Sequence, residues 1–147
     1  MQKIVEMTVE HVAQVAELER LCFRDPWSEK SIASELDNEL SHWLVLEENG
    51  KVLGYVGTQT VMDQTDMMNI AVHPDHRRRG IADALMAVLV SDLERMGSRC
   101  LMLEVRVSNE PARKLYERWG FAEAGRRRNY YRNPKEDALI LRKEIEA

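Results

Sequence analysis

One stretch of this chain, residues 69–86, combines three local signals that few folds accommodate together. Ile70–Val72 is a short apolar run with two β-branched residues, and Pro74 prevents that strand from continuing. Arg77–Arg79 form a basic turn, and apolar residues then recur at helical spacing from Gly80 onward. The stretch therefore predicts a strand, a tight turn and an amphipathic helix, an order typical of sheet-centred α/β domains.

The turn before this helix is a candidate anion site. Backbone N–H groups in the first turn of a helix have no partner inside the helix, and the helix dipole adds partial positive charge there. Arg77–Arg79 add cations, and Gly80 lets a ligand approach the backbone closely. Such a helix start suits a phosphorylated ligand. A solvated basic turn is the alternative interpretation.

Composition narrows the class of protein. Of the 147 residues, 44% are hydrophobic and 31% are charged, which favours one globular domain over residues 1–147. The net charge of −4 gives no overall basic field, so we expect no direct nucleic-acid binding. We find no membrane-spanning run and no leader segment, which predicts a cytoplasmic protein without a membrane partner. Cys22 and Cys100 lack metal-ligand spacing, so we interpret them as reduced core thiols and expect no metal.

Hydrophobic periodicity and turn signals predict the other elements. Thr8 caps a first helix whose apolar face includes Leu21, Ser28 caps a second helix, and Asn49-Gly50 predicts a hairpin turn. The predicted strands cover residues 3–6, 43–47, 52–60, 67–72, 100–105, 121–128 and 138–143. The predicted helices cover residues 8–22, 28–39, 80–96 and 111–119, and a connection is expected at 129–134. This order describes a mixed α/β domain.

Two motifs carry a resemblance to a known family. Arg77 to Ala82 is similar to the R/Q-x-x-G-x-G/A signature of the GNAT acetyltransferases, with alanine in place of the commoner final glycine. Downstream, the pattern N-x-x-A-x-x-L-Y-x-x-x-G-F from Asn109 to Phe121 resembles the second half of the family's cofactor region. The resemblance implies an α/β fold with a mixed, mainly antiparallel sheet of about six to seven strands, about four flanking helices and splayed central strands.

Further stretches resemble one subgroup of the family, the RimI type. They are Pro26–Glu29, Leu103–Asn109, Arg127–Tyr131 and Glu136–Ala138. Members of this subgroup acetylate the N-terminal alanine of a small-subunit ribosomal protein. The resemblance implies the same activity here, with the N-terminal peptide of a ribosomal protein as partner. We expect a monomer or a weak dimer.

The resemblance also implies acetyl-CoA as the co-substrate. The strand backbone at Ile70, Ala71 and Val72 would pair with the pantetheine amides, and the Val72 N–H would polarise the thioester carbonyl. The helix start would hold the pyrophosphate mainly through the backbone of Arg78, Arg79, Gly80, Ile81, Ala82 and Asp83. Asn109 would hold the pantetheine arm or brace the splayed strands, and a simple helix cap is the alternative.

Glu104 and Tyr116 are the candidate catalytic residues. The resemblance makes Glu104 the general base, acting through water, and a surface-facing strand carboxylate is the alternative. Tyr116 would return a proton to the departing thiolate, because a phenol with pKa ~10 holds its proton at neutral pH. A core aromatic is the alternative for Tyr116. Trp27 and Tyr131 would line the peptide groove from opposite sides, with packing roles as the alternative.

Proton affinity favours one class of amine. An α-amino group with pKa ~7.8 is about one-seventh neutral at pH 7, whereas lysine near ~10.4 is neutral in about one molecule per 2,500. A single carboxylate therefore suits an N-terminus, attacking the thioester directly, and Cys100 in a strand core is a poor rival nucleophile. A GNAT enzyme for another N-terminus, a lysine or a small amine stays open, as does an acyl-CoA-binding regulatory module.

Overall fold

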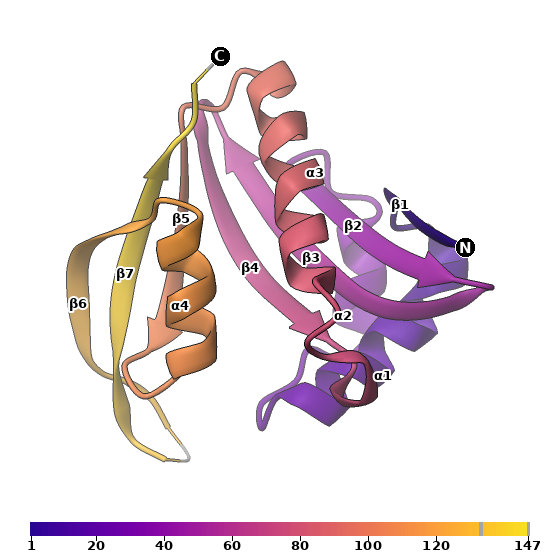
Figure 1. Ribbon diagram of the computed structural model, residues 1–147, viewed down its shortest axis with the longest axis horizontal. Helices are drawn as coiled ribbons and strands as arrows, with labels where there is room; N and C mark the ends of the chain where they lie inside the picture. The colour runs from indigo at the N-terminus through magenta and orange to yellow at the C-terminus, as the bar shows by residue number, and fades with distance from the viewer. Residues whose placement is uncertain (133, 147) are drawn as a thin grey trace.

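A seven-stranded sheet forms the centre of the structure, a computed structural model that describes residues 1–132 and 134–146 (Figure 1). The strand order is β1-β2-β3-β4-β5-β7-β6, and every neighbouring pair is antiparallel except β4 with β5. The strands are β1 Gln2–Glu6, β2 Ser41–Glu48, β3 Lys51–Val61, β4 Gln64–Val72, β5 Cys100–Arg106, β6 Ala122–Tyr131 and β7 Glu136–Glu144. The predicted mixed, mainly antiparallel sheet is confirmed.

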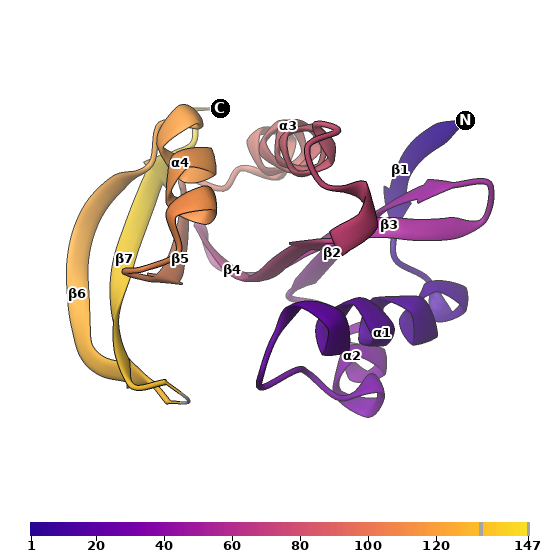
Figure 2. The same ribbon diagram turned by 60° about the horizontal axis from the view of Figure 1, so that its bottom comes forward.

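The α-helices of the described residues cover both faces of this sheet (Figure 2). One face carries α1 (Val12–Cys22), preceded by a 3-10 turn, and α2 (Glu29–Glu35); the other carries α3 (Ile81–Met96) and α4 (Glu110–Arg118). Successive strand side chains point to opposite faces, so Trp43 and Val45 of β2 pack on the α1 side and Leu44 and Leu46 on the α3 side. Each face of the sheet therefore has its own core.

The central strands β4 and β5 are paired at one end and diverge toward the other, as Figure 1 shows. Their parallel register joins Gln64–Asp66 with Cys100–Met102, and the described residues beyond these make no further β4–β5 pairs. The inner edges of residues 67–72 and 103–106 are therefore left without strand partners on that side. The predicted splay of the central strands is confirmed.

A β-bulge in β4 lies beside the point of divergence. The register of β4 on β3 shifts between Met67 and Asn69, which leaves Met68 as the extra residue. A bulge turns two successive side chains toward one face and increases the local bend of the strand. Met67 accordingly packs in the α3-side core, whereas Met68 packs on the α1 side and Asn69 reaches Glu19 of α1.

The special turn residues behave as the sequence predicts. Asn49 and Gly50 have φ of 53° and 81° at the β2–β3 hairpin, and Ser28 accepts a hydrogen bond from the Ser31 N–H at the start of α2. The left-handed Gly80 and Gly97 flank α3, with φ of 75° and 81°. These positions need positive φ or a capping oxygen, which the local sequence alone can supply.

The second helix is shorter than predicted. It ends at Glu35 rather than near residue 39, because the N–H groups of Asp37 and Asn38 bond carbonyls three residues back. The Asn38 side chain then accepts a hydrogen bond from the Leu40 N–H. Asn and Asp side chains favour such turns over continued helix.

Two further predictions are corrected. Tyr131 lies in β6 rather than in the connection expected at 129–134, and Asn133 of that connection lies outside the described residues. Leu21, predicted on the buried face of the first helix, is 48% exposed, while Glu19 of the same helix is fully buried. The rest of the predicted face, from Val12 to Leu18, is buried, so the difference is confined to the end of the helix, where Glu19 meets buried hydrogen-bond donors and Leu21 faces solvent.

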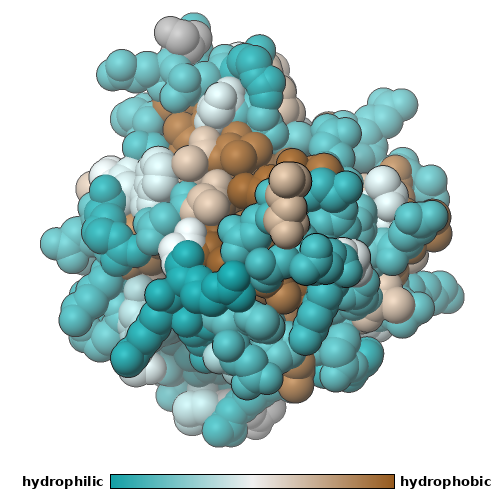
Figure 3. Space-filling view, turned by 45° about the vertical axis from the view of Figure 1, so that its right-hand side comes forward, coloured by the Kyte–Doolittle hydropathy of each residue, from teal (hydrophilic) through white to brown (hydrophobic). Residues whose placement is uncertain are grey.

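The surface in Figure 3 shows an apolar patch bordered by hydrophilic side chains. A groove of about 500 Å³ runs between β1, β2 and α3, and its apolar lining includes Ile4, Leu44, Val88 and Met96. Among the described residues, no helix is long and apolar enough to cross a membrane. The same residues hold no group of three or more His, Cys, Asp or Glu placed to bind a metal ion.

Candidate active site

The turn between β4 and α3 presents backbone donors at an open surface. Its backbone is left-handed at Arg78 (φ 66°) and at Gly80 (φ 75°), and the first helical bond runs from the Ala84 N–H to the Gly80 carbonyl. The N–H groups of residues 80–83 therefore have no partner in the helix. A Cβ built on Gly80 would meet nothing within 4 Å, so the backbone there is open to a ligand. These features fit a pyrophosphate.

Two of the three arginines of the turn, Arg77 and Arg79, bind other parts of the protein. Arg77 donates to the Val72 carbonyl at 3.3 Å and lies against Cys22. Arg79 pairs with Glu48 at the β2–β3 hairpin, at 3.3 Å, and with His76. Because two of the three guanidinium groups are bound to protein atoms, backbone N–H groups supply most of the donors at the open surface of the turn.

The free edge of β4 offers a second set of backbone groups. The His73 N–H donates to the Leu53 carbonyl of β3 at 2.7 Å. Backbone N–H groups alternate in direction along a strand, so those of Val72 and Ile70 point away from β3, toward the edge that β5 has left. The side chains of Ile70 and Val72 pack against the α3-side core, and Ala71 is buried on the α1 side. This edge can hold an extended chain bearing amides.

Glu104 lies on β5 beyond its last pair with β4. Its carboxylate is 3.4 Å from the Nε of Arg127 on β6, and the side chain is 31% exposed. Burial, followed by the nearby Glu104 carboxylate, raises the pKa of the Tyr130 phenol. Glu104 is therefore held in place by β6 while keeping access to solvent, which a base acting through water needs.

Tyr116 of α4 lies buried at the divergence of the two strands. Its hydroxyl faces the Sδ of Met67 at 4.0 Å, and its ring packs edge-on against Phe121 with centroids 5.3 Å apart. Burial, with a smaller contribution from Tyr131, raises the pKa of Tyr116 above that of an exposed phenol. The group is thus protonated throughout the physiological range and is a weaker acid than the sequence alone predicts.

Tyr131 lies in the same region as Glu104 and Tyr116, whereas Trp27 lies on the α1 side of the sheet. Burial and Glu104 raise the pKa of Tyr131 to about 12, and Arg106 lies over its ring at 4.3 Å from the centroid. Trp27 belongs to the connection between α1 and α2, and its ring meets Trp43 edge-on at 5.5 Å. The structure therefore gathers Glu104, Tyr116 and Tyr131 on one side of the splay and leaves Trp27 on the α1 side.

Two predicted ligand residues have structural contacts as well. Asn109 caps α4, its Oδ1 accepting a hydrogen bond from the Ala112 N–H at 3.2 Å. Asp83 of α3 accepts hydrogen bonds from Arg118 at 3.0 Å and from the Trp119 indole at 2.9 Å. The Asp83 carboxylate therefore joins α3 to the end of α4.

Two residues near the site were missed in the sequence. Cys22 donates to the Val72 carbonyl at 3.6 Å, so this thiol, rather than Cys100, lies beside the free edge of β4. Burial raises the Cys22 pKa, which keeps the thiol protonated and a poor nucleophile. Glu19 lies under the same edge, and its helical spacing from Val12 and Val15 is the signal that could have placed it on the buried face.

Comparisons with known proteins agree with this geometry. A model of the acetyltransferase (GNAT) family matches residues 12–121. The chain is 45% identical over 118 residues, 79% of each chain, to a protein of Escherichia coli (strain K12) named ribosomal protein bS18-alanine N-acetyltransferase. It is 39% identical over 127 residues, 85% of each chain, to the protein of that name from Salmonella typhimurium. The crystal structure of the ribosomal-protein-S18-alanine N-acetyltransferase from Escherichia coli matches with a TM-score of 0.93 at 39% identity, covering 100% of this chain and 96% of that one.

Proposed function

The chain belongs to the GNAT acetyltransferase family, and we propose that it transfers acetyl from acetyl-CoA to the N-terminal alanine of ribosomal protein bS18. Relatives that carry this name align over most of both chains, including the Escherichia coli protein at 45% identity. The observation that carries the proposal is the splay itself. It has an unpaired edge at Ile70–Val72 on one side and Glu104 with Tyr116 on the other. A ribosomal-protein substrate would place the reaction in the cytoplasm.

Acetyl-CoA supplies the acetyl thioester when it is bound. The edge N–H groups of Ile70 and Val72 would hold its pantetheine amides and polarise the thioester carbonyl. The N–H groups that follow Arg78, through Asp83, would hold its pyrophosphate. Asn109 uses its side chain as a helix cap, so its contribution to binding is to fix the start of α4 beside the splay.

The residues of β5 and α4 would move the protons. The incoming amine must lose a proton, and the Glu104 carboxylate can accept it through one water because it is partly exposed. The nitrogen then forms the amide bond as the carbon–sulfur bond breaks, and the thiolate needs a proton. Tyr116 holds one at the divergence of β4 and β5 and would donate it. No covalent acyl-enzyme is required, since burial raises the pKa of the Cys22 thiol and Cys100 is buried at the paired end of β5.

The peptide would enter between two aromatic side chains. Tyr131 lies next to Glu104 on the β6 side, where the attacking amine must be, and its ring is held by Arg106. Trp27 would contact the peptide from the connection between α1 and α2. Both residues are partly buried, which suits a contact surface that a peptide completes.

A peptide panel tests this proposal. Purified protein is mixed with acetyl-CoA and the alanine-initiated N-terminal peptide of bS18. A second peptide has a blocked α-amine and an internal lysine, so that it can be acetylated only on the lysine. The panel also includes peptides with other first residues and a set of small amines. We expect thiol release with the free alanine peptide and none with its blocked form. Faster acetylation of lysine or of small amines would overturn the proposal, and tight acetyl-CoA binding without any thiol release would indicate a regulatory module.

A further inference from the structure

A buried carboxylate lies between the two predicted binding regions. Glu19 of α1 is fully buried and accepts hydrogen bonds from the Trp27 backbone N–H at 2.8 Å, from the Asn69 side chain at 2.8 Å, and from the Tyr55 hydroxyl. All three donors are neutral. Burying a carboxylate lowers the stability of the folded state unless the carboxylate is fully hydrogen-bonded. We therefore expect Glu19 to have a role that an apolar side chain could not fill.

The three donors come from three separate segments. Trp27 lies in the connection between α1 and α2, on the peptide side. Asn69 follows the bulge of β4 and immediately precedes the cofactor edge that begins at Ile70. Tyr55 lies in the middle of β3, and burial and then Glu19 raise the pKa of its phenol. One carboxylate thus binds the peptide-side connection and the cofactor strand at the same time.

An aromatic stack closes this arrangement into a ring of contacts. Trp27 meets Trp43 edge-on at 5.5 Å, and Trp43 stacks on Tyr55 at 5.8 Å with the planes within 5°. The Tyr55 hydroxyl in turn donates its hydrogen bond to Glu19. Gly57 makes the stack possible, because a Cβ at that position would overlap the Trp43 indole. The Trp27 connection is therefore fixed at its backbone by Glu19 and at its ring by Trp43.

We propose that Glu19 is a positioning residue that sets the spacing between the peptide-binding connection at Trp27 and the acetyl-CoA edge of β4. The inference rests on the proposed function. Its physical basis is that both carboxylate oxygens accept hydrogen bonds. Oε1 accepts one from Trp27, and Oε2 accepts those from Asn69 and Tyr55. A glutamine would bring an NH₂ group against one set of donors, and an alanine would leave all three without an acceptor.

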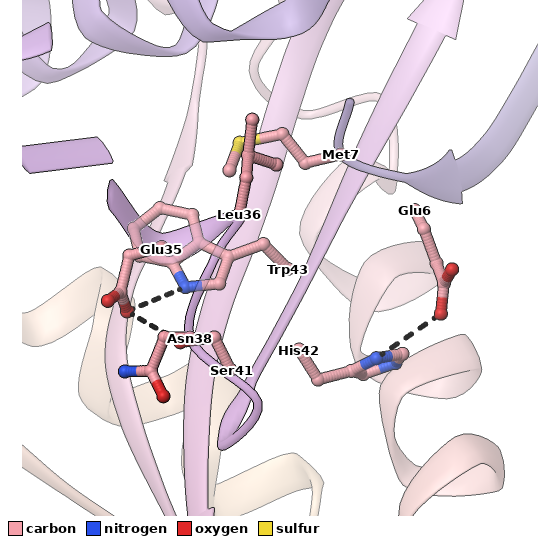
Figure 4. Close-up of a pocket in the computed structure, with 8 residues that line it drawn as sticks. All are labelled: Glu6, Met7, Glu35, Leu36, Asn38, Ser41, His42 and Trp43. Atoms are coloured by element: carbon pink, nitrogen blue, oxygen red, sulfur yellow. Dashed lines mark hydrogen bonds and ion pairs between the residues drawn. The ribbon is translucent and has the colours of Figure 1, made fainter. Parts of the chain in front are cut away.

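A second buried glutamate provides a matched control. Glu35 of α2 also accepts three hydrogen bonds, from Trp43 Nε1 at 3.2 Å, Gln59 Nε2 at 2.8 Å and Ser41 Oγ at 3.0 Å. Figure 4 shows it in a small pocket, with dashed lines to Trp43 and Ser41. Its donors belong to β2 and β3, not to the Trp27 connection or to β4. Glu35 thus resembles Glu19 in its buried hydrogen bonds, but it bonds neither the Trp27 backbone nor β4, and it reaches Trp27 only through the Trp43 ring.

The experiment compares Glu19→Ala with Glu35→Ala by thermal unfolding, by steady-state kinetics with the bS18 peptide, and by calorimetric binding of acetyl-CoA. We expect both variants to lose thermal stability. Glu19→Ala should raise the KM for the peptide by about tenfold and weaken acetyl-CoA binding by about threefold. Glu35→Ala, which reaches Trp27 only through the Trp43 ring, should raise that KM less and leave acetyl-CoA binding unchanged. If Glu19→Ala does not fold, Asn69→Ala breaks the β4 contact alone and should still weaken acetyl-CoA binding.

Two outcomes separate this inference from the proposed function. If the KM for the peptide and the acetyl-CoA affinity of Glu19→Ala equal those of Glu35→Ala, Glu19 is a stability residue only and the inference is overturned. If the wild-type protein binds acetyl-CoA but acetylates no alanine-initiated peptide, the proposed function fails. The acetyl-CoA affinity of the Glu19 and Asn69 variants then still decides whether Glu19 positions the cofactor edge.

Discussion

The two parts of the sheet on either side of the splay contribute different groups to the site. The four-stranded part, β1–β4 with α1–α3, offers backbone: the β4 edge and the start of α3. The three-stranded part, β5–β7 with α4, offers side chains: Glu104, Tyr116 and Tyr131. The α1-side core lies wholly within the four-stranded part, whereas β6 is exposed along most of its length.

This division has a physical reason. Backbone donors bind well only when the segment carrying them is held rigidly, and two packed cores hold β4 from both faces. A general base needs contact with water and substrate, which a thin, exposed layer allows. Substitutions in the three-stranded part should therefore change turnover, and those in the four-stranded part should change stability and binding. The following variants test that division.

The largest effect is expected at Glu104. Glu104→Gln removes the proposed proton acceptor while preserving the shape of the side chain, so kcat should fall by about a thousandfold. The free energy of unfolding should change little, because the ion pair with Arg127 is solvent-exposed. Steady-state thiol release measures the first quantity and urea unfolding the second. Glu123→Gln, an exposed glutamate of β6, is the control and should retain wild-type turnover. Wild-type turnover of Glu104→Gln would show that Glu104 is not the general base.

Tyr116→Phe should have the next largest effect. It removes the hydroxyl that would protonate the thiolate, and kcat should fall by about a hundredfold. The phenylalanine ring keeps the packing on Phe121, and the lost contact to Met67 sulfur is weak, so stability should fall by less than about 1 kcal/mol. Single-turnover kinetics with saturating acetyl-CoA isolates the chemical step. Unchanged single-turnover rates would make Tyr116 a core aromatic.

Gly57→Ala tests the packing of the four-stranded part. The added methyl group would overlap the Trp43 indole, and the variant should lose about 1–3 kcal/mol of unfolding free energy. The control lies in the three-stranded part: a Cβ on Gly125 of β6 would meet Ile140 at an ordinary 3.5 Å. Gly125→Ala should therefore be neutral in urea unfolding. Equal losses of unfolding free energy in the two variants would contradict the contrast between the tightly packed four-stranded part and the thin three-stranded part.

Asp83→Ala should give the smallest effect, at the junction of the two parts. Its carboxylate ties α3 to Arg118 and Trp119 of α4, across the splay. Loss of this partly exposed contact should cost about 1 kcal/mol and weaken acetyl-CoA binding about threefold. Calorimetry measures both. Asp63→Ala breaks an exposed ion pair with Arg99 and is the matched control, expected to behave as wild type. Unchanged acetyl-CoA binding in Asp83→Ala would show that the parts hold their spacing without this contact.

Local chemistry determined much of this molecule from sequence alone. The hairpin at Asn49-Gly50, the left-handed glycines around α3 and the Ser28 cap follow from what single residues allow the backbone to do. The strand, turn and helix of residues 69–86 could be predicted for the same reason. The two motifs then identified the family, and with it the sheet, the splay and the residue types expected beside it.

Tertiary structure decided what depends on partners distant in the chain. No local pattern marks Met68 as a bulge, since the bulge exists only in the register of β4 on β3. Donors from the α1–α2 connection, β3 and β4 converge on the buried Glu19, and no local pattern predicts that convergence or the exposure of Leu21. The sequence of residues 69–86 supplies a helix start with free N–H groups. The depth of Tyr116 and the distance from Glu104 to Arg127 exist only once the two parts of the sheet have packed, because burial and charge pairing are properties of the assembled fold.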